Sequence, residues 1–119
     1  MQVKWIEYKG KKILSVDYRG ANSLEDMVNV LHQEVNIEKT LKEKTVVLAN
    51  FEGTHGSGEY MSELKKLGKE VRNEKTSKTA LLGITGVKKV LLSAYIAFTG
   101  DKNLRPFDNE EDALAWLIL

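Results

Sequence analysis

The sequence contains no cysteine among its 119 residues. This absence excludes a disulfide framework, a thiol nucleophile, and any zinc or iron–sulfur site that depends on cysteine ligands. A single proline and a hydrophobic fraction of 42% are typical of an ordinary folded domain rather than of a disordered or fibrous chain. At this length we expect one domain, residues 1–119, which can bury a core without a covalent staple.

The sequence also lacks a long hydrophobic run and a strong excess of either charge. The longest apolar stretch, residues 90–98, is interrupted by Ser93 and is too short to cross a bilayer. The first residues, MQVKWIEYKGKK, contain no apolar segment of the kind found in signal peptides, so we expect a cytoplasmic protein without membrane insertion. Eighteen basic and seventeen acidic side chains give a net charge of +1. A net charge this small gives no reason to expect a nucleic-acid partner.

Basic residues are nevertheless concentrated in one segment. Residues 61–105 carry ten basic and four acidic side chains. In this segment Glu63, Glu70 and Glu74 are mixed among lysines and Arg72, at spacings that suit ion pairs along the solvated face of a helix. A nucleic-acid site would need a continuous basic stripe or interleaved aromatic residues. We therefore expect Arg72 and its neighbouring lysines to face solvent.

The spacing of apolar residues predicts alternating strands and helices. Strands are expected at residues 3–8, 12–18, 45–51, 79–84 and 104–107, and helices after residues 23, 58, 86 and 108. The predicted order is therefore β-β-α-β-α-β-α-β-α. This order indicates an α/β fold, a single-domain mixed, mostly parallel sheet with helices packed against it. Asp108 and Glu111 form a predicted capping box for the terminal helix.

The third predicted helix, residues 87–99, is apolar around most of its circumference. We expect one stripe of it, which includes Val90, to pack on the sheet. The flank would then carry Leu92, Tyr95 and Ile96, and a helix that is apolar all round is normally covered on more than one side. This flank is a candidate homodimer interface, because a two-fold contact would bury it against its own copy. In the alternative, the terminal helix covers the flank and the protein is a monomer.

A glycine-rich loop, residues 53–58, separates the predicted central strand from the second helix. Its three glycines and the helix start that follows favour an anion, because free N–H groups and the helix dipole would point at it. The loop is neither a P-loop, since Glu59 stands where lysine is needed, nor a dinucleotide fingerprint. Alternatively, Ser57 simply caps the helix. The candidate regulatory or ligand-binding residues are Thr54, His55, Gly56, Ser57 and Gly58.

His55 and Ser57 lie two residues apart, which is compatible with a base and a nucleophile. The local sequence supplies no recognisable orienting acid or oxyanion site, and no G-x-S-x-G elbow is present. His32 and His55 also lack the spacing of a metal pair. We therefore expect no catalytic residue, no metal and no cofactor. An uncharacterised enzyme that uses His55 and Ser57 stays open as an alternative.

Two segments carry a resemblance to a known family. The start, WIEY at residues 5–8 with ILSVDYRG at residues 13–20, and the end, RPFDNEEDALAWL at residues 105–117, resemble the STAS-like superfamily, named for sulfate transporters and anti-sigma factor antagonists. Within it, the chain is similar to small free-standing SpoIIAA-like proteins. The resemblance covers essentially the whole chain and implies a regulatory protein that works by binding a protein partner or a small ligand.

The resemblance also indicates one candidate phosphorylation site. In the anti-sigma factor antagonists, a kinase partner phosphorylates a serine between a central strand and the following helix, and the similar position here is Ser57, followed by Gly58. The loop departs from the antagonist pattern, because Thr-His-Gly-Ser-Gly replaces an acidic residue and paired small hydroxyl residues.

A distant lipid-transfer group shares the architecture. A carrier of a small apolar or lipid-like ligand, held under the second and third helices near Tyr60, Leu64, Tyr95 and Phe98, is therefore a further alternative.

Overall fold

The computed structural model describes all residues from 1 to 119. The chain begins with β1 (Gln2–Tyr8) and β2 (Lys11–Asp17), followed by α1 (Leu24–Glu38), β3 (Thr45–Asn50) and α2 (Gly58–Leu67). A π-helical segment, η1 (Gly68–Arg72), and a short helix, α3 (Asn73–Lys75), extend α2. The remaining elements are β4 (Thr76–Leu82), α4 (Val87–Thr99), β5 (Leu104–Phe107) and α5 (Glu110–Leu117). The predicted order of strands and helices is confirmed.

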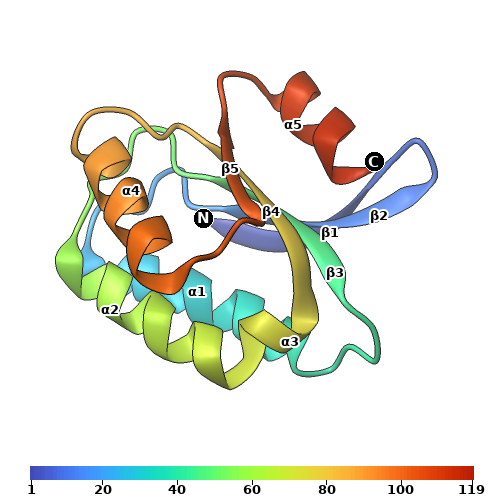
Figure 1. Cartoon of the computed structure of the whole chain (residues 1–119), viewed down its shortest axis with the longest axis horizontal. Coiled ribbons are helices and arrows are strands. Elements are labelled where there is room, and N and C mark those ends of the chain that lie inside the picture. Colours follow the sequence, from blue (N-terminus) through green and yellow to red (C-terminus); the bar gives the residue numbers. More distant parts are fainter.

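The five strands form one sheet in the order β1-β2-β3-β4-β5. β1 and β2 are antiparallel, as a hairpin requires, and the other three neighbouring pairs are parallel. Figure 1 shows α1, α2 and α4 on one side of the sheet and α5 on the other. The predicted fold class, an α/β domain with a mixed, mostly parallel sheet, is confirmed.

Helices cover both faces of the sheet, and alternate residues of each strand point to opposite faces. Each strand therefore contributes side chains to two cores. On the larger side, Leu14, Val47 and Leu81 pack against Leu31 of α1 and Leu67 of α2. Fully burying a side chain of this size contributes about 1.5–3 kcal/mol. Leu48, the residue after Val47 in β3, faces the other side of the sheet. Because β3 is covered on both faces, nearly all of its residues are apolar.

On the opposite side, α5 alone covers the sheet. Ala113 and Leu117 are fully buried there against Ile13 and Ala80. The helix begins one residue later than expected. Asn109, and not Asp108, is the N-cap, and its side chain accepts a hydrogen bond from the N–H of Asp112 at 2.8 Å. Asp108 and Glu111 therefore do not form the capping box, because the exact register of a cap depends on local backbone geometry.

The segment after α2 differs most from the sequence prediction. The helical backbone continues to Lys75, so β4 begins at Thr76 and not at residue 79. This continuation turns Arg72 inward, where it is 8% exposed, and the prediction of a solvent-facing Arg72 is wrong. The Nε of Arg72 lies 2.9 Å from a carboxyl oxygen of Glu34 and 3.7 Å from one of Glu38, and both carboxyl groups are buried. A buried guanidinium needs such partners.

The helix α4 is also rotated relative to the expected packing. Tyr95 is 6% exposed and Leu92 packs against the larger core, whereas Val90 is 67% and Phe98 73% exposed. The placement of Tyr95 on an exposed flank is therefore wrong. The apolar periodicity of this helix offers more than one inward face, and Tyr95 fills the space beside α2. None of the helices is both long and apolar enough to span a bilayer.

Candidate functional site

The Gly53–Gly58 loop lies at the carboxyl ends of the parallel strands β3 and β4, where ligand sites of open α/β sheets are found. Its base is fixed to β4, because the N–H of Phe51 donates to the carbonyl of Leu82 at 2.8 Å. Gly83, the residue after Leu82, has a φ of +75°, in the left-handed region. The sheet therefore holds the start of the loop in one position.

An aromatic cluster supports the loop from below. The rings of Tyr18 and Phe51 are stacked with centroids 4.4 Å apart, and Tyr60 meets both edge-on. The buried hydroxyl of Tyr60 donates to that of Tyr18 at 2.8 Å. Burial raises the pKa of both phenols well above the ordinary value, so both stay neutral. Since Phe51 precedes the loop and Tyr60 follows it, the cluster fixes both of its ends.

Within the loop, the candidate side chains have different environments. Thr54 is buried, and its hydroxyl donates to the carbonyl of Phe51 at 2.7 Å, so this residue stabilises the turn. His55 is exposed. Ser57 is half-buried, and its Oγ accepts a hydrogen bond from the N–H of Tyr60 at 3.0 Å. The interpretation of Ser57 as the N-cap of α2 is confirmed.

The backbone of the loop provides a row of free hydrogen-bond donors. The N–H groups of residues 55–59 donate to no acceptor within the protein. They immediately precede or begin the ten-residue helix α2, whose dipole places partial positive charge there. Lys88 adds a nearby cation, while Glu52 and Glu59 add acidic groups beside the same segment. The loop can therefore satisfy an acceptor, such as an anion or a partner's carbonyl.

Ser57 provides a direct test of the capping arrangement. We expect Ser57→Ala to lower the free energy of unfolding by about 1 kcal/mol, because the N–H of Tyr60 loses its acceptor, and Ser57→Gly to lower it by only a few tenths. Urea denaturation of both variants measures the difference. Equal and negligible losses would contradict a capping role for this hydroxyl.

Helix α4 packs against the outer side of the loop. A Cβ on Gly56 would lie 2.6 Å from a methyl carbon of Leu91 and 3.0 Å from one of Val87, so a larger residue here would force these side chains to move. The ammonium of Lys88 donates to the carbonyl of Phe51 at 2.9 Å. Partial burial lowers the pKa of Lys88, and the charge of Glu52 opposes the shift. The start of α4 and the loop therefore form one continuous surface.

A small apolar cavity lies beneath this surface. It is bordered by Tyr60, Leu64 and Tyr95, as a carrier would require, but its volume is only about 60 Å³. This is far below the range of about 300–1,000 Å³ that small-molecule sites occupy. Phe98 does not border this cavity. As the structure stands, the cavity is too small for a lipid chain, and this disfavours the carrier.

The geometry offers little support for the enzyme alternative. No hydrogen bond joins His55 to Ser57, and the bond that Ser57 Oγ makes to the backbone belongs to the helix cap. The buried carboxylate of Glu34 is bound to Arg72 instead, and the buried Glu38 accepts a hydrogen bond from the hydroxyl of Thr76. The loop residues are thus arranged for contact through the backbone.

Comparisons with known proteins identify the architecture. No protein-family model matches the sequence, and no curated protein matches it significantly. Among solved structures, an uncharacterised DUF3478-family protein from Shewanella loihica PV-4, described as having a SpoIIAA-like fold, superposes with a TM-score of 0.70. The chains are 18% identical, and the match covers 98% of this chain and 92% of that one. The present chain has a SpoIIAA-like fold.

A second solved structure agrees with this assignment. An anti-sigma-factor antagonist (STAS) domain protein from Planctomyces limnophilus superposes with a TM-score of 0.62 at 13% identity, over 97% of this chain and 96% of that one. The resemblance inferred from the two ends of the sequence is therefore confirmed at the level of the fold. At such identities the likeness extends to architecture and not to residue roles.

Two groups beside the loop were missed by the sequence reasoning. Lys88 gave no signal, because a lysine in the first turn of a helix is ordinarily solvated, and only the fold brings it to the carbonyl of Phe51. Val90 was assigned to an inward-facing stripe, yet it is 67% exposed, and Val87 on the same helix is 61% exposed. They extend the loop surface along α4.

Proposed function

We propose that this protein is a non-catalytic binding module of the STAS-like type, and that it regulates a protein partner by contact at the Gly53–Gly58 loop. The observation that carries the proposal is the row of free N–H donors at residues 55–59, next to the exposed apolar side chains of Val87 and Val90. Such a surface combines hydrogen-bond donors with apolar area, as protein interfaces do. The SpoIIAA-like fold is consistent with this role.

Within this proposal, Ser57 is the residue at which phosphorylation would change the contact. A phosphate on its Oγ would lie at the start of α2, where free N–H groups and the helix dipole favour negative charge. The same N–H groups would donate to a small anion in place of a partner's acceptor group. We assign the protein to the cytoplasm, where a kinase and its nucleotide are available.

The test is co-purification from the native cell, with bound proteins identified by mass spectrometry. His55→Glu places a new negative charge on the exposed part of the loop, and Gln33→Glu places the same charge on the exposed surface of α1 as a matched control. A partner that is retained by wild type and by Gln33→Glu, and lost by His55→Glu, supports the proposal. Partners that remain bound to all three proteins would contradict contact at the loop.

Self-association through α4 is a separate part of the proposal. Val87, Val90 and Phe98 expose large apolar side chains on one helix, and extended apolar patches of this kind often mark interfaces. The basic residues of α4, Lys88 and Lys89, lie near one end, so a two-fold antiparallel pairing would keep the lysines of the two copies apart. The exposed side chains thus move the expected interface away from Leu92 and Tyr95.

We expect the protein to be a homodimer of about twice 13.4 kDa by light scattering at micromolar concentration. Val90→Glu should give a monomer, because pairing would desolvate an unpaired charge. Gln33→Glu, with the same added charge on α1, should leave the dimer intact. A wild-type monomer, or a dimer that survives Val90→Glu, would show that this face is not the interface.

A further inference from the structure

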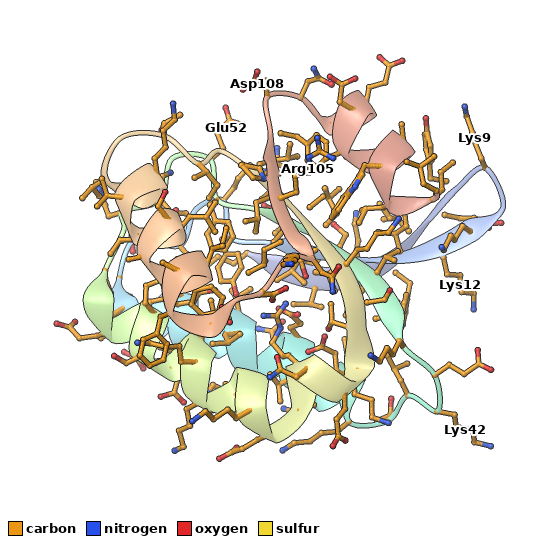
Figure 2. All side chains as sticks on the ribbon, viewed as in Figure 1. Lys9, Lys12, Lys42, Glu52, Arg105 and Asp108 are labelled. Carbon is orange, nitrogen blue, oxygen red and sulfur yellow. The ribbon has the colours of Figure 1, made fainter.

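A second, larger cavity lies at the end of the sheet opposite the loop. It has a volume of about 570 Å³ and is bordered by the end of α2, η1, the start of β4 and the end of α4. Lys44, Thr76 and Asn103, which precede or begin β3, β4 and β5, place it at the amino ends of the parallel strands. Figure 2 shows Lys42 at this end of the molecule and Glu52 at the other. The volume lies within the range of about 300–1,000 Å³ that small-molecule sites occupy.

The lining of this cavity is polar, unlike that of the small cavity beneath the loop. Only two of its 15 lining residues are hydrophobic. The side-chain amides of Asn73 and Asn103 make no hydrogen bond within the protein, and both residues border the cavity. They provide donors for a ligand with several oxygen atoms.

Positive charge predominates around the cavity. The ammonium groups of Lys44 and Lys69 make no ion pair or hydrogen bond within the protein, and that of Lys65 lies 4.2 Å from the centroid of the Phe98 ring. Lys78 does not add to this charge, because its ammonium donates to the carbonyls of Trp116 and Leu119 on the other side of the sheet.

The opposing charges are fewer. Asp101 is the acidic residue of the lining, and one of its carboxylate oxygens accepts a hydrogen bond from the N–H of Asn103 at 2.8 Å. The carboxyl end of α4 contributes a partial negative charge of about half a unit. Three lysines therefore exceed the negative groups by more than one unit of charge.

Arg72 forms a fixed part of the cavity wall. Its Nε is held by Glu34 at 2.9 Å, and its Nη2 donates to the hydroxyl of Thr79 at 3.3 Å. Because Glu34 already balances its charge, the excess over the cavity comes from the lysines. The buried guanidinium nevertheless ties the helical segment that carries Lys65 and Lys69 to β4, which keeps the cavity open between them.

We propose that this cavity binds a small anion of the phosphate type with at least two negative charges. Several ammonium groups and free amide donors around one space suit the oxygen atoms of such a ligand, and each charge-assisted hydrogen bond is stronger than a neutral one. A dianion matches the local excess, whereas a long polyanion would extend over a surface whose overall charge is near zero. The site is independent of the function proposed for the loop.

The test is a titration with inorganic pyrophosphate, followed by amide chemical shifts in nuclear magnetic resonance at constant ionic strength. Pyrophosphate should bind saturably and shift the amides of residues 69, 73, 99 and 103. Lys69→Glu should raise the dissociation constant about tenfold or more, because a repulsive charge replaces an attractive one. Lys69→Gln should raise it by less.

Lys4→Glu is the matched control, because Lys4 is exposed on β1, at the far edge of the sheet. It changes the net charge as Lys69→Glu does and should alter the dissociation constant by less than about twofold. Thermal unfolding confirms that each variant is folded. No saturable binding, or equal weakening by Lys4→Glu and Lys69→Glu, would overturn the proposal. Shifts confined to residues 55–59 would overturn it as well, and would assign anion binding to the loop.

Discussion

Gly83→Ala is expected to lower the free energy of unfolding by about 3 kcal/mol or more. Gly83 has a φ of +75°, and a Cβ at this position would lie 2.3 Å from the nitrogen and 2.5 Å from the Cα of Glu52. These atoms belong to the backbone, so no side chain can rotate away to make room. Either β4 or the start of the loop must move, and the hydrogen bond between Phe51 and Leu82 would be strained.

Gly53→Ala is the matched control, because Gly53 also has a φ of +75° but has no atom within 4 Å of the position of a Cβ. It should cost about 1–2 kcal/mol, the price of the left-handed conformation alone. The difference between the two variants, measured from urea denaturation curves, therefore reports the close approach of β4 to the loop. Similar losses for both variants would show that the base of the loop adapts easily.

The close approach at Gly83 also bears on binding. Because Glu52 immediately precedes the loop, a shift at this point would displace the free N–H groups of residues 55–59 relative to α4. Gly83→Ala should therefore weaken partner binding as well as stability, whereas Gly53→Ala retains the contact between β3 and β4. The loop depends on the sheet for its position.

The order of elements was predictable because each has a strong local pattern. The apolar run of β3 and the helical spacing of Leu31 and Val35 in α1 are short-range signals that tertiary packing reinforces. The cap at Ser57 could be predicted for the same reason, since its oxygen bonds to the N–H only three residues away. These features require no knowledge of what lies across the fold.

The predictions that were wrong concern features that depend on contacts between residues far apart in the sequence. The sequence around Arg72 indicates a solvated helix, and only the approach of α1 brings Glu34 to within 2.9 Å of it. For α4, several inward faces satisfy the same periodicity, and Tyr95 decides between them by filling a gap beside α2. The larger cavity is assembled from separate segments, so no single stretch of sequence carries its signal.

The stability of the protein is expected to fall as the pH rises from about 4.5 to about 8, because of Glu38. Its carboxyl group is fully buried, with Oε1 lacking a hydrogen bond, and Oε2 accepts from the hydroxyl of Thr76. Burial, and then the charge of Glu34, raise the pKa of Glu38 from 4.5 to about 8, although Arg72 opposes the shift. Arg72 bonds to Glu34 instead, so Glu38 is held in its neutral form.

The sign follows from proton binding. Between pH 4.5 and 8 the folded protein keeps the proton of Glu38, whereas the unfolded chain releases it. The folded state therefore binds more protons, and the free energy of unfolding must decrease as the pH increases through this interval. Each unit of difference in pKa corresponds to about 1.4 kcal/mol, so the total loss is on the order of 3–5 kcal/mol. Below pH 4.5 both states carry the proton and this effect disappears.

Glu38→Gln isolates this contribution, because an amide has nearly the size and hydrogen-bonding groups of the neutral carboxyl but does not ionise. The free energy of unfolding of the variant should match that of wild type at pH 5 and exceed it by a few kcal/mol at pH 9. At pH 9 the folded wild-type protein must either ionise a buried carboxyl group or keep its proton at a cost in stability, and the amide of the variant avoids both. Glu70→Gln, on the exposed surface of η1, should follow the wild-type curve at every pH. Urea denaturation from pH 5 to pH 9 measures all three proteins. If Glu38→Gln and wild type lost stability in parallel, Glu38 would be ionised in the folded state, and Arg72 would have to balance both carboxylates.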